Sequence, residues 1–224
     1  MRNSRMNENI IIIGGEGNGS VIADAITDTC LRGNSNARIY GFLNDRKNKG
    51  DLISGYPVLG ALSDLQLFLD QGCRFVYTIY HIDGQKERID LFHNLKIPVK
   101  SLFTFVHPMA YVAPSARIGR GVIIMPQVSV SSEAVIGDCC LLMVNSSVGH
   151  NSIIAPHCHL AAQCCLSSHV LLEEGVHIGL NATVREHLTL KKYSTLGMGS
   201  VLLNNIDKRE IWAGNPARFI RRSK

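Results

Sequence analysis

The sequence predicts two folds in one chain of 224 residues, and three observations lead to this prediction. Short apolar strands alternate with helical segments over residues 1–105, which indicates an α/β domain with a parallel sheet. Aliphatic residues recur every six positions within residues 106–224, which indicates an all-β domain, a parallel β-helix. The chain is 46% hydrophobic and 18% charged, a composition too apolar for a disordered protein.

The six-residue repeat is the strongest signal in the chain. It runs from Val106 to Leu202 without an insertion or deletion, and all 17 positions hold Ile, Leu or Val. Helices repeat every 3.6 residues and strands every two, so neither explains this spacing. Six residues is the length of one short strand and one corner. Three such units therefore make one 18-residue coil of a three-sided prism.

The fifth residue of each six-residue unit supports a tight corner. It is Ala, Ser, Cys or Val in 15 of the 17 units, and the exceptions are Leu188 and Ile206. Cys140, Cys158 and Cys164 occupy this small position. We therefore interpret them as buried hydrophobic residues rather than as disulfide or metal-binding cysteines.

Composition and charge limit the location and the partners. The polar segment Met1–Asn9 does not resemble a signal peptide, so the seven cysteines predict a cytoplasmic protein with reduced thiols. No apolar run approaches the ~20 residues of a transmembrane helix, and we expect no membrane insertion. The net charge of +5 is mild and gives no reason to expect a nucleic-acid partner.

The first hundred residues predict a Rossmann-like half-domain. We expect strands at residues 9–14, 38–43, 75–80 and 100–105, and helices at residues 21–30, 63–69 and 85–95. Four parallel strands are about half of a dinucleotide-binding fold. A domain of this size favours a mononucleotide ligand over NAD.

A glycine-rich turn, Gly14-Gly15-Glu16-Gly17-Asn18-Gly19, joins the first strand to the first helix. The free N–H groups and the dipole of a helix N-terminus attract a phosphate group. Asn44-Asp45 ends the second strand, where an acidic residue of a Rossmann-type site binds ribose hydroxyls. The glycine spacing is not G-x-G-x-x-G, so a tight βα turn without a ligand remains the alternative.

The repeat also places the histidines. Residues 18 apart stack in columns, so His159 stacks on His177. His150 is third in its unit, at a strand position beside a corner, where its side chain points outward. It is a candidate general base, and surface solvation is the alternative. His159 is half a coil away on another face, which favours a trimer with sites between subunits.

The coil histidines give no sign of a metal site. They include no pair five residues apart, the spacing of the β-helix enzymes that bind zinc through three histidines. We therefore expect no metal.

Several motifs occur together. In the first half they are Ile12-Ile13-Gly14-Gly15-x-Gly17-x-Gly19, Gly41-Phe42-Leu43-Asn44-Asp45, Gly55-Tyr56-Pro57-Val58-Leu59-Gly60 and His107-Pro108; in the second half they are Asn145-Ser146-Ser147-Val148-Gly149-His150, His159, Gly179-Leu180-Asn181, Leu196-Gly197-Met198-Gly199 and Gly214-Asn215-Pro216-Ala217-Arg218. With them the chain resembles, over essentially its whole length, the bacterial hexapeptide acyltransferases with a small nucleotide-binding N-terminal domain. Members acetylate nucleotide-linked amino sugars, and close relatives are named sialic-acid O-acetyltransferases.

The resemblance implies a left-handed β-helix, a homotrimer, and acetyl-CoA bound between subunits as the co-substrate. It implies that His150 is the catalytic base, followed by Asn151, and that His159 lies beside the thioester. The implied acetyl-CoA site comprises His159, Ser168, Leu180, Gly197, Met198 and Gly199. The implied nucleotide-sugar site comprises Glu16, Gly17, Asn18, Asn44, Asp45 and Gly60.

The chain departs from the family pattern at several positions. Asn151 stands where the family usually has an acid, and its amide carbonyl can orient an imidazole but cannot supply a negative charge. Asn18 and Ser20 replace a frequent histidine and lysine of the glycine turn, and Ser168 replaces a glycine near the thioester. These departures leave the fold unaffected and the substrate unidentified.

The sequence therefore predicts an acetyl-CoA-dependent N-acetyltransferase acting on a nucleotide-linked amino sugar. Two other functions remain open, namely O-acetylation of a sialic-acid-like sugar and a β-helix scaffold that has lost catalysis. The basic residues of the C-terminal tail either meet the CoA phosphates or are solvated; they are Lys208, Arg209, Arg218, Arg221, Arg222 and Lys224.

Overall fold

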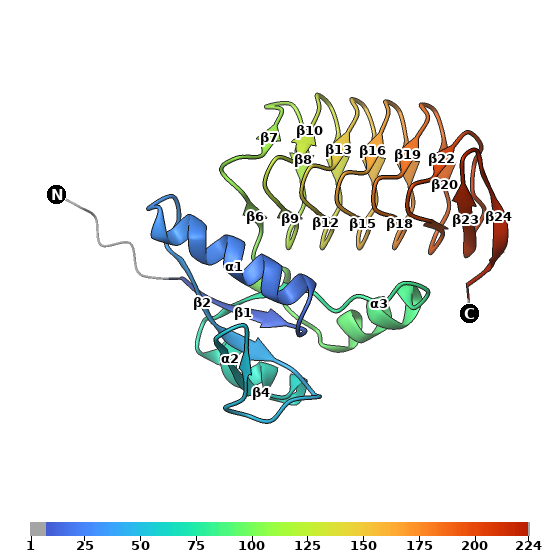
Figure 1. The fold of residues 1–224 in the computed structure, drawn as a ribbon. Helices are drawn as coiled ribbons and strands as arrows, with labels where there is room; N and C mark the ends of the chain where they lie inside the picture. The colour runs from blue at the N-terminus through green and yellow to red at the C-terminus, as the bar shows by residue number, and fades with distance from the viewer. Residues whose placement is uncertain (1–7, 224) are drawn as a thin grey trace.

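The computed structural model describes residues 8–223, in which an α/β domain lies along one side of a long β-prism (Figure 1). Residues 1–7, which belong to the polar N-terminal segment considered above, and Lys224 of the basic tail lie outside the described residues. Within the described part of the chain, no helix is both long enough and apolar enough to cross a membrane.

The N-terminal domain has one five-stranded sheet with the strand order β3-β4-β2-β1-β5. Its strands are β1 (Glu8–Ile13), β2 (Ala37–Leu43), β3 (Leu52–Ile53), β4 (Tyr56–Gly60) and β5 (Arg74–Tyr77). Its helices are α1 (Asn18–Leu31), α2 (Leu65–Asp70) and α3 (Gln85–Asn94), with 3-10 turns at Leu62–Asp64 and Val99–Ser101. All pairs are parallel except β3 with β4, so the predicted α/β domain is confirmed.

The fourth parallel strand differs from the prediction. The segment expected as a strand at 100–105 begins instead within the 3-10 turn Val99–Ser101, and then makes a single bridge between Leu102 and Phe75. Pro98, just before this turn, has no N–H to donate to a ladder. The fourth strand is β4, which pairs with β2. We missed it because Pro57 lies inside it and proline is rare in strands.

The second domain is a left-handed parallel β-helix built from 17 two-residue strands. They are β6 (Phe105–Val106), β7 (Tyr111–Val112), β8 (Arg117–Ile118), β9 (Ile123–Ile124), β10 (Ser129–Val130), β11 (Val135–Ile136), β12 (Leu141–Leu142), β13 (Ser147–Val148), β14 (Ile153–Ile154), β15 (His159–Leu160), β16 (Cys165–Leu166), β17 (Leu171–Leu172), β18 (His177–Ile178), β19 (Thr183–Val184), β20 (Thr189–Leu190), β21 (Thr195–Leu196) and β22 (Val201–Leu202). The second residue of each strand is one of the 17 predicted aliphatic positions.

The strands form three faces, and each face contains every third strand. We call the face with β12, β15 and β18 the docked face, because the N-terminal domain lies on it. The second face contains β13, β16 and β19, and the third face contains β14 and β17. Parallel pairs join residues 18 apart, as with His159 and His177, which confirms the predicted stacking.

The interior of the prism is the predicted aliphatic core. The periodic residues from Ile124 to Leu202 are at most 2% exposed. Cys140, Cys158 and Cys164 at the small fifth positions are also buried, with free thiols. The periodic residues of the first three units are less buried, since no preceding coil covers them.

The fourth residue of each unit, which the sequence analysis did not use, turns the corner. From Gly121 to Gly199 this residue has a positive φ in every unit, including 57° at Asn151 and 57° at His169. This conformation is unfavourable for most residues and easiest for Gly and Asn. Hydrogen bonds between coils hold it in place: the Asn151 N–H donates to the carbonyl of Ser132 at 3.0 Å.

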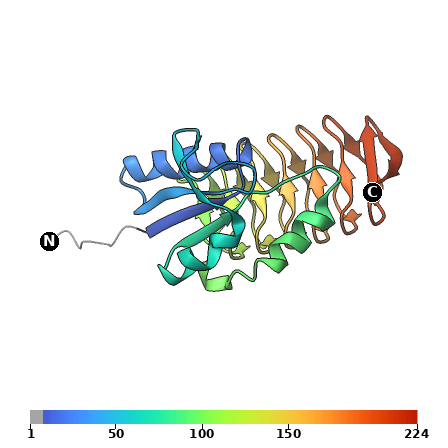
Figure 2. The same ribbon diagram turned by 90° about the horizontal axis from the view of Figure 1, so that it is seen from below.

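Helix α3 runs along the prism (Figures 1 and 2), and residues at its start and just before it attach the N-terminal domain to the docked face. Gln85 Nε2 donates to Thr195 Oγ1 at 2.7 Å, and Arg88 Nη2 donates to the carbonyl of His157 at 2.7 Å. The ring of Tyr80 stacks on His159 with 4.2 Å between ring centroids. These contacts fix the height of the N-terminal domain along the prism.

The C-terminal segment is a hairpin rather than the expected tail. Strands β23 (Glu210–Gly214) and β24 (Ala217–Arg222) are antiparallel, and β23 extends the docked face by pairing with β21. Arg221 Nη2 donates to Asp83 Oδ2 at 2.8 Å, so one of the basic residues binds a carboxylate of the N-terminal domain.

Candidate active site

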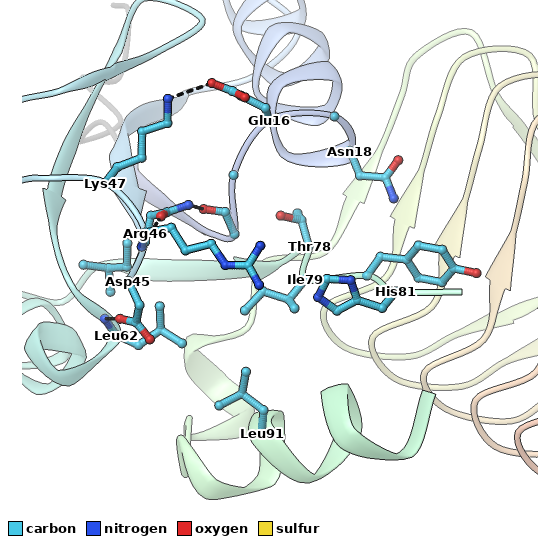
Figure 3. A pocket seen from close by; sticks show the side chains of 16 residues that line it. Glu16, Asn18, Asp45, Arg46, Lys47, Leu62, Thr78, Ile79, His81 and Leu91 are labelled. Carbon is cyan, nitrogen blue, oxygen red and sulfur yellow. Dashed lines mark hydrogen bonds and ion pairs between the residues drawn. The ribbon is translucent and has the colours of Figure 1, made fainter. Parts of the chain in front are cut away.

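A cavity of about 650 Å³ opens at the carboxyl ends of the parallel strands β1, β2 and β5 (Figure 3). It is lined by Gly14, Gly15, Glu16, Gly17, Asn18, Leu43, Asn44, Asp45, Arg46, Lys47, Leu62, Thr78, Ile79, Tyr80, His81 and Leu91. This edge is where open parallel sheets bind ligands. Five of the six predicted nucleotide-sugar residues line the cavity, and Gly60 is the exception.

The glycine turn has the backbone geometry of a phosphate cradle. Gly14 has φ of 144°, and a Cβ there would lie 2.2 Å from Thr78 Oγ1, so only glycine fits. Gly17 precedes α1 with φ of 82°, and no side chain among the described residues caps this helix end. The first N–H groups of α1 are therefore open to an anion at the positive end of the helix dipole.

The residues after β2 shape the floor of the cavity. Asn44 Nδ2 donates to the carbonyl of Gly14 at 2.8 Å, while its Oδ1 accepts from the N–H of Arg46 at 2.7 Å. Asp45 Oδ1 accepts from the N–H of Leu62 at 2.7 Å. Gly60 lies behind this loop, and its carbonyl oxygen accepts a hydrogen bond from the N–H of Asn44 at 3.0 Å. Asn44 therefore braces the glycine turn, and Asp45 keeps one carboxylate oxygen for a ligand.

Two cations that the sequence analysis did not select stand at the cavity. Arg46 extends into it, and Lys47 makes a 2.9 Å ion pair with Glu16 (Figure 3). The hydrogen bond and the charge of Glu16 raise the pKa of Lys47 above its ordinary value. Their position in the sequence could have identified them, because they directly follow Asn44-Asp45 at the predicted site. Cations beside a helix N-terminus suit a phosphate ligand.

The end of β5 supplies the remaining wall. The strand stops at Tyr77, three residues earlier than predicted, and residues 78–81 turn into the cavity. Burial raises the pKa of Tyr80 above its ordinary value, and the Tyr80 hydroxyl has no hydrogen-bond partner in the described structure. The rule that ligands bind at the carboxyl ends of parallel strands points to these residues.

His150 is exposed at the corner between the second and third faces, in the turn after β13 rather than within a strand. Its Nδ1 lies 2.8 Å from Asn151 Oδ1. A carbonyl oxygen can only accept, so Nδ1 carries the proton and Nε2 keeps a free lone pair. The imidazole of His169, one coil away, meets the ring of His150 edge to face at 5.3 Å. This geometry suits a general base that is oriented by an amide.

His159, which the resemblance places beside the thioester, contacts the N-terminal domain of its own chain. It is 6% exposed and sits on the docked face beneath Tyr80 of its own chain. Its Nδ1 is 3.1 Å from His177 Nδ1, and its Nε2 is 3.5 Å from Asn18 Nδ2. In this chain, His159 therefore contacts the glycine turn of the nucleotide pocket.

The other predicted acetyl-CoA residues lie at two corners. Leu180, Gly197, Met198 and Gly199 lie where the docked face meets the second face; Leu180 is 51% and Met198 is 73% exposed. Ser168 stands one coil from His150, at the corner between the second and third faces. A single chain thus divides the predicted residues between separate corners. Among the described residues, no group of three His, Cys, Asp or Glu side chains could hold a metal ion.

Comparison with known proteins bears on both domains. Residues 9–81 match the family model of the PglD N-terminal domain. Over 96% of its length the chain is similar to the whole acetyltransferase domain of PglB from Neisseria gonorrhoeae FA1090, with 26% identity and a TM-score of 0.81. That domain in complex with acetyl coenzyme A matches at 25% identity, with a TM-score of 0.81 and coverage of 96% of this chain and 100% of that one. No curated protein matches the chain.

A third solved structure supports the fold alone. A mutant of the GDP-perosamine N-acetyl transferase from Caulobacter crescentus, in complex with CoA and GDP-perosamine, is 22% identical. The match has a TM-score of 0.77 and covers 96% of this chain and 98% of that one. Residues 9–81 thus form a PglD-type N-terminal domain, and over nearly its whole length the chain is similar to bacterial hexapeptide-repeat sugar acetyltransferases.

Proposed function

We propose that this protein transfers an acetyl group from acetyl-CoA to the amino group of a nucleotide-linked amino sugar, in the cytoplasm. One observation carries the proposal: an exposed imidazole with a free Nε2 lies at the same height on the prism as an uncapped helix N-terminus beside a cavity. His150 and His159 are nine residues apart in an 18-residue coil, and His159 contacts Asn18 of that cavity. The base and the pocket therefore share one layer.

The active site is completed by a neighbouring copy, and we propose a homotrimer. The pocket belongs to the docked face, and His150 belongs to the corner between the second and third faces, so one chain cannot apply both to one sugar. Beside His150, the outward residues Ile153 and Leu171 of the third face are 50% and 36% exposed. Burying apolar surface of this kind stabilises association. In a trimer around an axis parallel to the prisms, His150 of one chain faces the pocket layer of the next.

In the proposed reaction, the N–H groups of α1 together with Arg46 hold the nucleotide phosphates, and the sugar reaches the neighbouring prism. His150 Nε2 accepts a proton from the amine as the nitrogen attacks the thioester carbonyl. The C–S bond breaks, CoA leaves as the thiolate, and the proton on His150 neutralises it. The co-substrate lies along the corner of Leu180 and Met198. This proposal agrees with the acetyl coenzyme A complex of the PglB domain.

The test is a CoA-release assay on the full chain with three groups of acceptors. Nucleotide-linked amino sugars should release CoA, whereas sialic acids and the same nucleotide sugars without an amino group should not. Release with sialic acids instead would establish O-acetylation. If the protein neither binds acetyl-CoA in isothermal titration nor releases CoA with any acceptor, it is a β-helix scaffold without catalytic activity.

A further inference from the structure

Two buried histidines connect the prism to the nucleotide pocket, and the proposed chemistry does not use them. His159 and His177 occupy adjacent coils of the docked face and are 6% and 5% exposed. Their rings stack at 5.1 Å between centroids, and Tyr80 covers both, at 4.2 Å from His159 and 5.2 Å from His177. Two imidazoles placed this close inside an interface need a reason, because each carries polar atoms that burial would otherwise leave unpaired.

The hydrogen bonds of this pair have a fixed direction. The Nδ2 of Asn18 is a donor, so His159 Nε2, 3.5 Å away, must accept. A neutral imidazole carries one proton, so His159 Nδ1 carries it and donates to His177 Nδ1 at 3.1 Å. His177 is then protonated at Nε2. The chain of donors runs from Asn18 through His159 to His177.

The surroundings keep both imidazoles neutral, as this direction requires. Burial, then His177 and Arg88, lower the pKa of His159 well below its ordinary value. Burial and Arg88 lower the pKa of His177 to about 4. Arg88 itself is 6% exposed, and among the described residues it forms no ion pair with a carboxylate. An uncompensated buried cation opposes a charge on either histidine.

We propose that His177 is a positioning residue for the nucleotide pocket. It accepts a hydrogen bond from the Nδ1–H of His159. His159 Nε2 is thereby left as the acceptor that orients Asn18 at the start of α1. Asn18 is the first residue of α1, beside the uncapped N–H groups. Fixing its amide holds the first helical turn in the geometry that an anion meets. The contribution of His177 to ligand affinity rests on the proposed function. The tautomers of the two histidines are independent of it.

The direct test is the tautomer of each histidine in the wild-type protein, read from imidazole nitrogen chemical shifts by NMR. His159 should be protonated at Nδ1 and His177 at Nε2, with and without a nucleotide present. In His177→Leu, His159 loses its acceptor and should change to the Nε2-protonated form. Finding His159 already protonated at Nε2 in the wild type would overturn the proposal.

The second test is nucleotide affinity, measured by isothermal titration of the full chain with UDP and with GDP. His177→Leu should weaken the binding of the preferred nucleotide about threefold to tenfold, the worth of one net hydrogen bond. His177→Asn, which places a side-chain oxygen near the former Nδ1, should restore most of it. His157→Asn is the matched control, because His157 is 4% exposed in the same interface but its ring meets Phe92 and His93, not Asn18 or His159.

The outcomes separate the two hypotheses. If the tautomers are as expected but neither nucleotide binds the wild type, the proposed nucleotide pocket fails and the pairing of the histidines stands. If the wild type binds and His177→Leu binds equally well, the positioning role is wrong. An equal loss of affinity in His157→Asn would reduce the effect to general loosening of the interface and would also contradict the proposal.

Discussion

His150 and His159 belong to the same coil of the prism, yet their surroundings are opposite. His150 is exposed, and its Nδ1 donates one hydrogen bond of 2.8 Å to the side-chain oxygen of its own neighbour, Asn151. His159 is 6% exposed, covered by Tyr80 and paired with His177. The repeat places both imidazoles outside the aliphatic core. What lies over each face decides whether the ring is a solvent-accessible base or part of an interface between domains.

This contrast separates two tasks along the prism. The uncovered corner can serve a second copy of the chain and a substrate, since Nε2 of His150 faces no partner within the described chain. The covered face fixes the N-terminal domain and its pocket at the height of that corner.

Removing the proposed base at the exposed corner should have the largest effect. His150→Ala should lower kcat for acetyl transfer by about 10²–10⁴-fold, the usual worth of a positioned general base. The melting temperature and the nucleotide affinity should stay close to wild type, because the side chain is exposed and lies away from the pocket of its own chain. Steady-state CoA release, thermal unfolding and isothermal titration with the nucleotide measure these three quantities.

A mixing experiment then asks whether the exposed corner serves another chain. Assemblies containing both His150→Ala chains and Asp45→Ala chains should regain part of the activity that each variant lacks alone, since some pairs of neighbours combine an intact base with an intact pocket. Asp45 serves here because it lines the cavity and hydrogen-bonds Leu62. No recovery in confirmed mixed assemblies would place base and pocket in one chain and contradict the shared site.

A third prediction concerns Asn151, which stands where the family pattern usually has an acid after the proposed base, His150. Asn151→Gly keeps a residue that favours the observed φ of 57° but removes the oxygen that orients His150. We expect kcat to fall about tenfold, the worth of one hydrogen bond to a group that becomes charged during the reaction. Asn151→Asp keeps an acceptor in place and should retain at least wild-type activity. An unchanged kcat in Asn151→Gly would show that the hydrogen bond does not orient the base.

The repeat made the prism predictable in unusual detail. The aliphatic positions from Ile124 to Leu202 all point into the core, and the small fifth residues from Val122 to Ser200 are buried because a corner leaves room for little else. The exposure of His150 followed from the same period. The sequence signal is strong here because each coil contacts only its neighbours, so local spacing determines packing.

The interface between the domains was not predictable in the same way. Tyr80 and His159 are 79 positions apart, and no periodicity relates the α/β domain to the docked face. The resemblance placed His159 beside a thioester, and nothing in the sequence indicated that it also lies under its own N-terminal domain. Strand β4 was missed for a local reason, Pro57, and Arg46 was missed because a cation at a loop resembles any solvated residue.

The smallest expected effect concerns the covered side and appears as a dependence of stability on pH. Burial lowers the pKa of His157 and of His177 from 6.5 to about 4, and Arg88 contributes to both shifts. The pKa of His159 is lowered as well. Between pH 6.5 and pH 4 the unfolded chain binds more protons than the folded one, so stability falls as the pH falls through this range.

Each buried histidine of this kind should cost about 1–2 kcal/mol of stability between pH 7 and pH 5. His157→Asn removes one of them and should reduce the fall in melting temperature over this range by a few degrees, while its stability at pH 7 is lower through lost packing. His150→Ala removes nothing from the covered face and should keep the wild-type pH dependence. If His157→Asn and wild type lose stability in parallel on acidification, the interface histidines are not held neutral. The covered and the exposed imidazoles would then differ in position but not in protonation.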